Sequence, residues 1–179
     1  MKNNLNYQKL TRAEISKFSQ IDRTETINNI YYKRDGNLIL EEEHHEVADW
    51  GFEEKQKRIS ELQDIFERGA TFFGAFDENN LVGMSVLNHN PVNSGNSRLN
   101  LEGLWVSDNY RGMGIGKALF QLAIQEARKI GAKSLYVSAT PSENTVRFYK
   151  KLGCRLAEPI DQHLYEKEPE DIHLELMLI

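Results

Sequence analysis

The sequence predicts an α/β fold, built on a mixed sheet with helices on both faces. Residues 71–76 and 81–87 have the composition of strands and are joined by a polar turn, which is typical of an antiparallel pair. An amphipathic helix at 115–130 separates two further strands, at 98–106 and 133–139. Because a strand, helix, strand unit crosses over right-handed, these two strands are expected to lie parallel.

Length and charge limit the class of protein. The chain has 179 residues, which suits a single domain over residues 1–179, and a formal net charge of −5 from 27 acidic and 22 basic side chains. Broad nucleic-acid binding is therefore not expected, and an acidic surface favours a cationic partner. The N-terminus lacks an apolar h-region and no run of about 20 apolar residues follows, so we predict no signal peptide, no membrane span and a cytoplasmic location.

The first helix is indicated by its capping residues. Thr11 and Glu14 form a capping-box pattern. Ile15 and Phe18 follow at helical spacing, so the helix is expected to begin near residue 12.

Residues 23–47 form a variable segment that contains a hairpin signal. Ile27, Ile30 and Tyr31 suit one face of a short helix. The pair Asp35-Gly36 then marks a turn between two apolar stretches. We therefore predict a short helix followed by a hairpin.

The run EEEHHE at residues 41–46 has alternative interpretations. It could attract a polyamine or bind a metal ion, but a charge run is usually a solvated strand or loop. Adjacent histidines on a strand point to opposite faces, which argues against a shared metal. Cys154 is the only cysteine, so it forms no internal disulfide or metal cluster, and we expect it to be small and buried. We predict no metal site.

The remaining elements follow from periodicity and capping. A second amphipathic helix spans 52–66 and is ended by Gly69. Residues 91–96 have the composition of a turn. Thr140 as N-cap, with Pro at the first helical position, predicts a helix through residue 153. Two further strands are expected, one from the apolar residues at 154–156 and one from the alternation over 172–179.

A glycine-rich turn lies between the strand at 98–106 and the helix at 115–130. Arg111, Gly112, Gly114 and Gly116 occupy the turn and the first helical turn, where backbone N–H groups are free and the helix dipole is positive. Such a turn can bind phosphate. Alternatively, the glycines only allow a tight turn and close packing of the helix on the sheet. A Rossmann loop is excluded, because it needs glycine at the position of Lys117. A Walker A loop is excluded, because it needs Ser or Thr at the position of Ala118.

Two blocks of sequence resemble the GNAT superfamily, the GCN5-related N-acetyltransferases. The first is the strand from Leu99 to Val106 with the turn at 111–116. The second is residues 144–153, which contain an asparagine, a Phe-Tyr pair and Lys-Leu-Gly. The resemblance covers most of the chain and says least about residues 23–47. It implies the GNAT acyl-CoA N-acyltransferase fold, with the sheet splayed between its fourth and fifth core strands.

The resemblance also implies a site for acetyl-CoA as co-substrate, with no metal. Pantetheine would pair with the backbone of Leu104, Trp105 and Val106, and Val106 N–H would face the thioester oxygen. The pyrophosphate would lie on the turn formed by Arg111, Gly112, Met113, Gly114, Ile115 and Gly116, with Lys117 beside it. Asn144 would bind the pantetheine arm, and Lys150 or Lys151 would meet the 3′-phosphate.

Two side chains match the catalytic positions of the family. Glu102 lies four residues before Val106 and is expected on the same strand face, as a base that accepts a proton from the amine; Asn100 could assist through water. A purely structural hydrogen bond, or binding of a cationic acceptor, is the alternative. Tyr149 would protonate the departing thiolate, although its spacing also suits a core aromatic.

These expectations define an acetyl-CoA-dependent N-acetyltransferase that transfers the acetyl group directly to a primary amine of a small molecule or peptide. The alternative is a non-catalytic acyl-CoA-binding sensor or interaction module with the same fold. The acceptor stays open, and the apolar last strand could pair across a homodimer interface.

Overall fold

The computed structural model describes residues 5–92 and 97–178. Within them, seven strands form one sheet and two form a separate hairpin. The sheet order is β1 (Leu5–Lys9), β4 (Thr71–Asp77), β5 (Asn80–Asn88), β6 (Arg98–Val106), β7 (Ser134–Ala139), β9 (Ile172–Met177) and β8 (Arg155–Leu156). Only β6 and β7 pair in parallel within these described ranges, whereas the other neighbours are antiparallel. The mixed sheet is thus confirmed.

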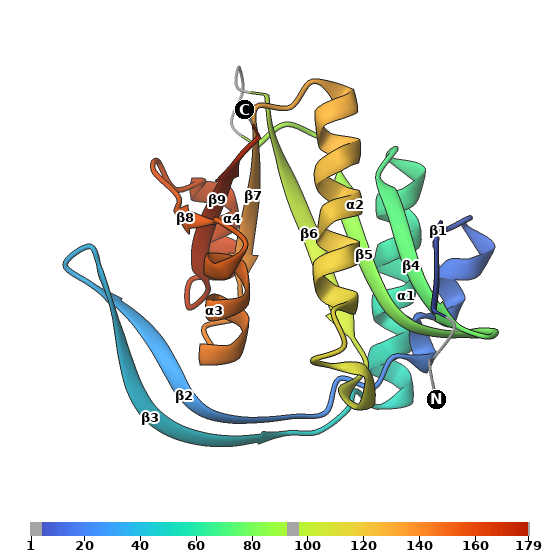
Figure 1. Ribbon diagram of the computed structural model, residues 1–179, viewed down its shortest axis with the longest axis horizontal. Coiled ribbons are helices and arrows are strands. Elements are labelled where there is room, and N and C mark those ends of the chain that lie inside the picture. The colour runs from blue at the N-terminus through green and yellow to red at the C-terminus, as the bar shows by residue number, and fades with distance from the viewer. Residues whose placement is uncertain (1–4, 93–96, 179) are drawn as a thin grey trace.

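Helices cover both faces of the sheet, as predicted (Figure 1). The helical elements are η1 (Ala13–Gln20) and η2 (Asp108–Tyr110), both 3-10 helices, and α1 (Phe52–Glu67), α2 (Ile115–Ile130), α3 (Glu143–Lys151) and α4 (Gln162–Lys167). Helices α2 and α3 share an apolar core on one face. Helix α1 and η1 form another core on the opposite face. The site described below lies between these layers.

Helix α2 follows its apolar periodicity closely. Its buried side chains are Ile115, Leu119, Phe120, Ala123, Ile124 and Ala127. Gly131 ends the helix at φ 90°, with its N–H bonded to the carbonyls of Ala127 and Arg128. A left-handed glycine at this position satisfies terminal carbonyls that have no partner inside the helix.

The predicted start of the first helix is confirmed, although the element is a 3-10 helix. Glu14 accepts hydrogen bonds from Thr11 N at 2.8 Å and from Thr11 Oγ1 at 2.9 Å. Ile15 and Phe18 are buried beneath it. Phe18 then packs edge-on against Trp105 of β6, with ring centroids 5.1 Å apart.

The short helix predicted near residues 27–31 is wrong. This stretch belongs to β2 (Glu25–Arg34), which pairs with β3 (Asn37–Val47) in a long hairpin. The predicted turn is confirmed, with Asp35 and Gly36 at φ 49° and 78°. Helical spacing is misleading here because half-buried side chains of β2 face α3, so tertiary contacts rather than local periodicity fix the conformation.

The start of α3 also differs from the prediction. Ser142, rather than Thr140, is the N-cap, and its Oγ accepts from Thr145 N at 3.3 Å. Residues 140–142 lie before the helix and contact β2, with Tyr31 N donating to Pro141 O at 2.7 Å and Ser142 bridged to Ile30. The sequence did not predict α4, whose N-cap is Asp161. Of the turn predicted at 91–96, residues 93–96 lie outside the described residues, as does residue 179 of the last strand.

None of the helices that the structure describes is long and apolar enough to cross a membrane.

Candidate active site

The parallel strands β6 and β7 separate halfway along β6. Their pairing runs from Arg98 opposite Ser134 to Leu101 opposite Val137, and stops there. Residues 103–106 pair only with β5 among the described strands, and Glu102 pairs with neither neighbour. In Figure 1 the two strands diverge toward their C-terminal ends. The expected splay between the fourth and fifth core strands is therefore present, and one edge of β6 has no strand partner in the part of the chain that the structure describes.

The backbone at the end of β6 is oriented toward this opening. Ser107 N donates to Val82 O of the β5 strand at 2.9 Å. Since successive residues of a strand direct their N–H groups to alternate edges, Val106 N–H points away from β5, toward the split. An unpaired N–H at this place can stabilise an oxygen that gains negative charge.

A β-bulge at Glu102 changes which side chains share a face. Val86 is opposite Gly103 but Leu87 is opposite Leu101, so Glu102 has no partner on β5. Consequently Leu104 and Val106 pack toward α2, whereas Trp105 packs with the α1 core. Glu102 lies on the α1 side with Asn100. The expectation that Glu102 and Val106 share a strand face is therefore wrong, because a bulge shifts the alternation by one residue.

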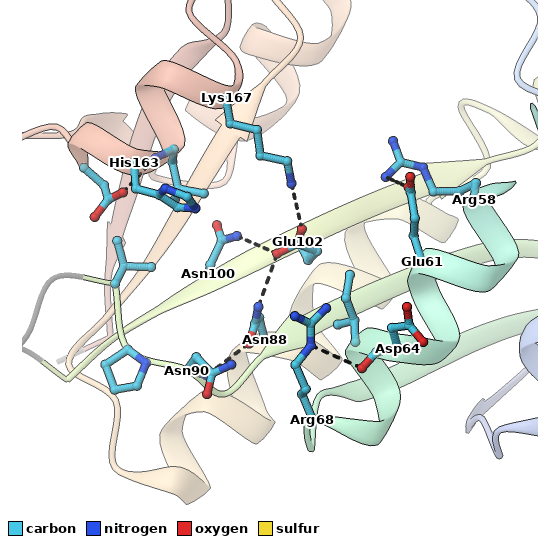
Figure 2. Close-up of a pocket in the computed structure, with 15 residues that line it drawn as sticks. Arg58, Glu61, Asp64, Arg68, Asn88, Asn90, Asn100, Glu102, His163 and Lys167 are labelled. Carbon is cyan, nitrogen blue, oxygen red and sulfur yellow. Dashed lines mark hydrogen bonds and ion pairs between the residues drawn. The ribbon is translucent and has the colours of Figure 1, made fainter.

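Glu102 is held by polar groups at the floor of a pocket of about 520 Å³. Asn100 Nδ2 and Asn88 Nδ2 donate to its Oε2 at 3.0 and 3.3 Å, and Lys167 Nζ lies 3.4 Å from its Oε1 (Figure 2). The walls come from α1, α4 and the end of β5. Asn88 and Lys167 could not be found from the sequence, because they are 14 and 65 positions from Glu102 and carry no motif.

The glycine-rich turn presents free N–H groups at the start of α2. Gly112 and Gly114 have φ 77° and 85°, and both face open space, since a Cβ added to either would meet nothing within 4 Å. The helical bonds begin with Ala118 N donating to Gly114 O at 3.0 Å. The preceding N–H groups, those of the first helical turn, have no intrahelical acceptor. Together with the positive end of the helix dipole, this arrangement suits phosphate.

Arg111 is engaged by protein groups rather than extended from the turn. Its Nη1 donates to Thr24 O at 2.8 Å and its Nε to Val106 O at 3.2 Å, while its backbone N–H bonds Asp108 O at 3.1 Å. The guanidinium therefore ties the turn to the end of β6 and to the base of the hairpin. Met113 and Lys117 are exposed beside it.

Helix α3 lies next to this turn. A Cβ on Gly116 would come within 3.3 Å of the Phe148 ring, so glycine permits close approach of the two helices. Tyr149, the next residue, is 6% exposed and packs edge-on against Phe120 with ring centroids 5.5 Å apart. Burial raises the pKa of Tyr149 above its ordinary value of 10, so the hydroxyl keeps its proton. Asn144 is exposed in the first turn of α3.

The hairpin connects the two sides of the split. Besides the contact of Thr24 with the glycine turn, Asn29 Nδ2 donates to Glu143 Oε2 of α3 at 2.7 Å. Tyr31 also bonds the segment before α3. These contacts could not be inferred from the sequence, since a hairpin predicted in isolation has no assigned partner.

Titratable groups outside the split include the cysteine and the histidines considered above. Cys154 is buried, as expected, and burial raises the pKa of its thiol to about 12. His44 and His45 bond different carboxylates, Glu46 and Glu43. Among the described residues, no three histidine, cysteine or acidic side chains are grouped to hold a metal ion.

Asp171 is a further titratable group, which the sequence did not single out. Burial raises its pKa to about 6, with Glu168 and Glu170 adding to the effect. Its carboxyl is therefore partly protonated near neutral pH, unlike an exposed aspartate.

The fold and this site define a class of α/β domains in which two parallel strands separate next to a glycine-rich helix start. A family profile described as the acetyltransferase (GNAT) family matches residues 32–154. The chain therefore belongs to the acetyltransferase (GNAT) family, and the resemblance seen in the sequence is confirmed.

Solved structures agree in fold. Nourseothricin acetyltransferase superposes with a TM-score of 0.72 at 19% identity, over 98% of this chain and 99% of that one. A GNAT acetyltransferase from Staphylococcus aureus Mu50 superposes with a TM-score of 0.65 at 15% identity, over 98% of this chain and 99% of that one. The PaiA N-acetyltransferase from Thermoplasma acidophilum, in complex with coenzyme A, superposes with a TM-score of 0.63 at 17% identity, over 97% of this chain and 99% of that one. A search of curated proteins found no match.

Proposed function

We propose that this protein is an acetyl-CoA-dependent N-acetyltransferase that acts on a primary amine of a small molecule or peptide. The observation that carries the proposal is the continuity between the unpaired edge of β6 and the start of α2. An extended amide-containing chain can bond such an edge, and a phosphate attached to it would then reach the free N–H groups of the helix. The coenzyme A in the PaiA complex supports this choice by analogy of fold.

The described residues fit this co-substrate. The open space over Gly112 and Gly114 leaves room for a phosphate at the free N–H groups. Trp105 contributes only backbone, because its indole belongs to the α1 core. Arg111 acts by holding the turn. The proposed binding set is Leu104, Trp105, Val106, Arg111, Gly112, Met113, Gly114, Ile115, Gly116, Lys117, Asn144 and Tyr149.

Three groups of the chain are proposed to take part in the transfer. Acetyl-CoA supplies a thioester, whose carbonyl carbon bonds the amine nitrogen as the carbon–sulfur bond breaks. Val106 N–H donates to the carbonyl oxygen as it gains charge. Glu102 accepts the proton that the amine nitrogen loses, directly or through one water. Tyr149 is proposed to donate its hydroxyl proton to the thiolate, whose conjugate acid has a pKa of about 8.5.

Calorimetric titration of acetyl-CoA into the purified protein tests the cofactor site. A thiol-release screen in the same buffer, against small primary amines and lysine peptides, then tests turnover. Binding with amine-dependent thiol release is the expected result. Absence of acetyl-CoA binding would refute the assignment of the glycine-rich turn, and binding without turnover by any amine would favour the sensor alternative.

A further inference from the structure

One buried polar atom in the pocket lacks a partner. Asn100 is 6% exposed, and its Oδ1 is the only buried side-chain nitrogen or oxygen without a hydrogen bond among the residues described, 5–92 and 97–178. Its orientation is fixed, because the amide nitrogen faces Glu102 Oε2 at 3.0 Å and an oxygen there would be repelled. A buried acceptor left unpaired destabilises the folded state, because it has lost its bonds to water without replacement. Such an atom therefore indicates a missing donor.

The neighbouring carboxylate is bonded unevenly. Glu102 Oε2 takes both amide donors, whereas Oε1 has only Lys167 Nζ among the described residues, at 3.4 Å. The Lys167 side chain is 52% exposed, and exposed pairs of this kind contribute little to stability. A cation therefore already lies at Oε1, but it belongs to a side chain that is readily displaced.

The walls of the pocket combine apolar side chains, those of Ile65, Pro91, Val92 and Leu164, with charged and amide groups. On α1, Arg58 Nη1 lies 3.1 Å from Glu61 Oε2, and just after the helix Arg68 Nε donates to the Asp64 carbonyl at 3.2 Å (Figure 2). The pocket is on the α1 face of the sheet, opposite to α2 and the glycine-rich turn. Two ligands could therefore reach β6 from opposite faces.

We propose that this pocket binds a small molecule through its primary ammonium group, which replaces Lys167 Nζ at Glu102 and donates a further hydrogen bond to Asn100 Oδ1. An ammonium has three donors, enough for both acceptors. Asn100 belongs to the lining of the same pocket as Glu102 and Lys167, so its Oδ1 lies next to the position that the ammonium would take. This inference rests on the proposed function, and it assigns the acceptor's binding site and chemical class.

The probe is ethylammonium chloride, titrated into the ¹⁵N-labelled full chain while the side-chain amide resonances are followed. Tetramethylammonium chloride is the control ion, because it has the same charge and no N–H donor. We expect saturable shifts of the Asn100 amide at roughly millimolar concentrations with ethylammonium and not with tetramethylammonium.

Three variants locate the effect. Asn100→Ala should weaken ethylammonium binding by about 10-fold or more, the size expected for one hydrogen bond to a charged group. Lys167→Met, at an exposed position, should tighten it by removing the competing cation. Asn88→Ala is the matched control: Asn88 also donates to Glu102, but its Oδ1 already accepts from Asn90 N at 3.0 Å, so binding should change little.

Equal shifts with both ions, unchanged binding in Asn100→Ala, or weaker binding in Lys167→Met would each overturn the inference. If a blocked lysine pentapeptide bound more tightly than ethylammonium, and this binding depended on Asn100, the assignment of a small molecule as the ligand would be overturned. Calorimetry with acetyl-CoA on the same samples separates the two proposals. Retained acetyl-CoA binding without the ethylammonium effect refutes this inference alone, whereas loss of acetyl-CoA binding refutes the proposed function.

Discussion

Replacement of Tyr149 by phenylalanine isolates the hydroxyl proposed to protonate the thiolate. The phenyl ring keeps the edge-on contacts with Phe120 and Phe148, at 5.5 and 5.0 Å between centroids, so the fold should be retained. We expect the variant to lower the rate by about 10- to 1000-fold, within or near the range for loss of one general acid. This corresponds to about 1.4–4 kcal/mol in activation free energy. We expect that loss in kcat, with the affinity for acetyl-CoA little changed.

The assay combines thiol release with calorimetric titration of acetyl-CoA, and Tyr136 supplies a matched control. Tyr136 is also a buried tyrosine, but its hydroxyl lies 2.9 Å from His173 Nδ1 and accepts from Asp161 N at 3.1 Å. Tyr136→Phe should therefore lower the free energy of unfolding by about 1–3 kcal/mol and leave kcat unchanged. Unchanged kcat in Tyr149→Phe would show that Tyr149 is a core aromatic and would refute the proton-donor role.

Three further predictions follow from the structure. Gly114→Ala should reduce the affinity for acetyl-CoA at least about 10-fold. Gly36→Ala is the control, because Gly36 has a similar positive φ and open surroundings, so the variant should strain the backbone without changing that affinity. Equal affinities of the two variants for acetyl-CoA would exclude the turn from the site. The folded-state pKa of Asp171 is raised to about 6 from 3.8, so its contribution to stability is lost as pH rises from about 4 to 6. In Asp171→Asn, the free energy of unfolding, measured by urea unfolding at each pH, should therefore change less over this pH range, by up to about 3 kcal/mol. The same pH dependence in the variant and the natural protein would contradict the raised pKa. Glu175→Gln removes the negative charge of the buried Arg98–Glu175 ion pair. It should lower the free energy of unfolding, measured with urea, by about 3 kcal/mol, which is more than the loss of an exposed ion pair would cost.

Local signals predict the half of the site that is formed by consecutive residues. The glycine-rich turn, α2 and the strand before it lie within one stretch, and their glycine positions and apolar spacing determine their geometry. The proposed role of Tyr149 depends on the resemblance, because its spacing alone also suits a core aromatic. The structure places it in the apolar core next to the turn, and its role in proton transfer stays a prediction.

The other half depends on contacts between distant residues. The bulge at Glu102 arises from the register of β5 against β6, and no residue type in the sequence marks it. Asn100 can be assigned to the correct strand face from the sequence, yet its unpaired oxygen is visible only once every neighbour is placed. Lys167 belongs to α4, a short helix capped by Asp161 in a segment that has the composition of a polar connection.

Strand β2 and the segment before α3 show how the conformation of one element depends on another. Residues 140–142 have the local chemistry of a helix start but stay outside the helix, because the hairpin bonds Pro141 and Ser142. Ser142 then takes the capping role in place of Thr140. The local capping preference is therefore overridden by a backbone hydrogen bond from a strand that is distant in the sequence.

The hairpin acts mechanically as a tie across the split strands. It is bonded to the glycine-rich turn through Thr24 and Arg111, and to the segment before α3 through Tyr31 N and Pro141 O. A molecule that widens the separation of β6 and β7 would strain these bonds together with the bond from Asn29 to Glu143. The exchange rate of the Tyr31 amide proton should therefore report the opening of the sheet, without any label at the site itself.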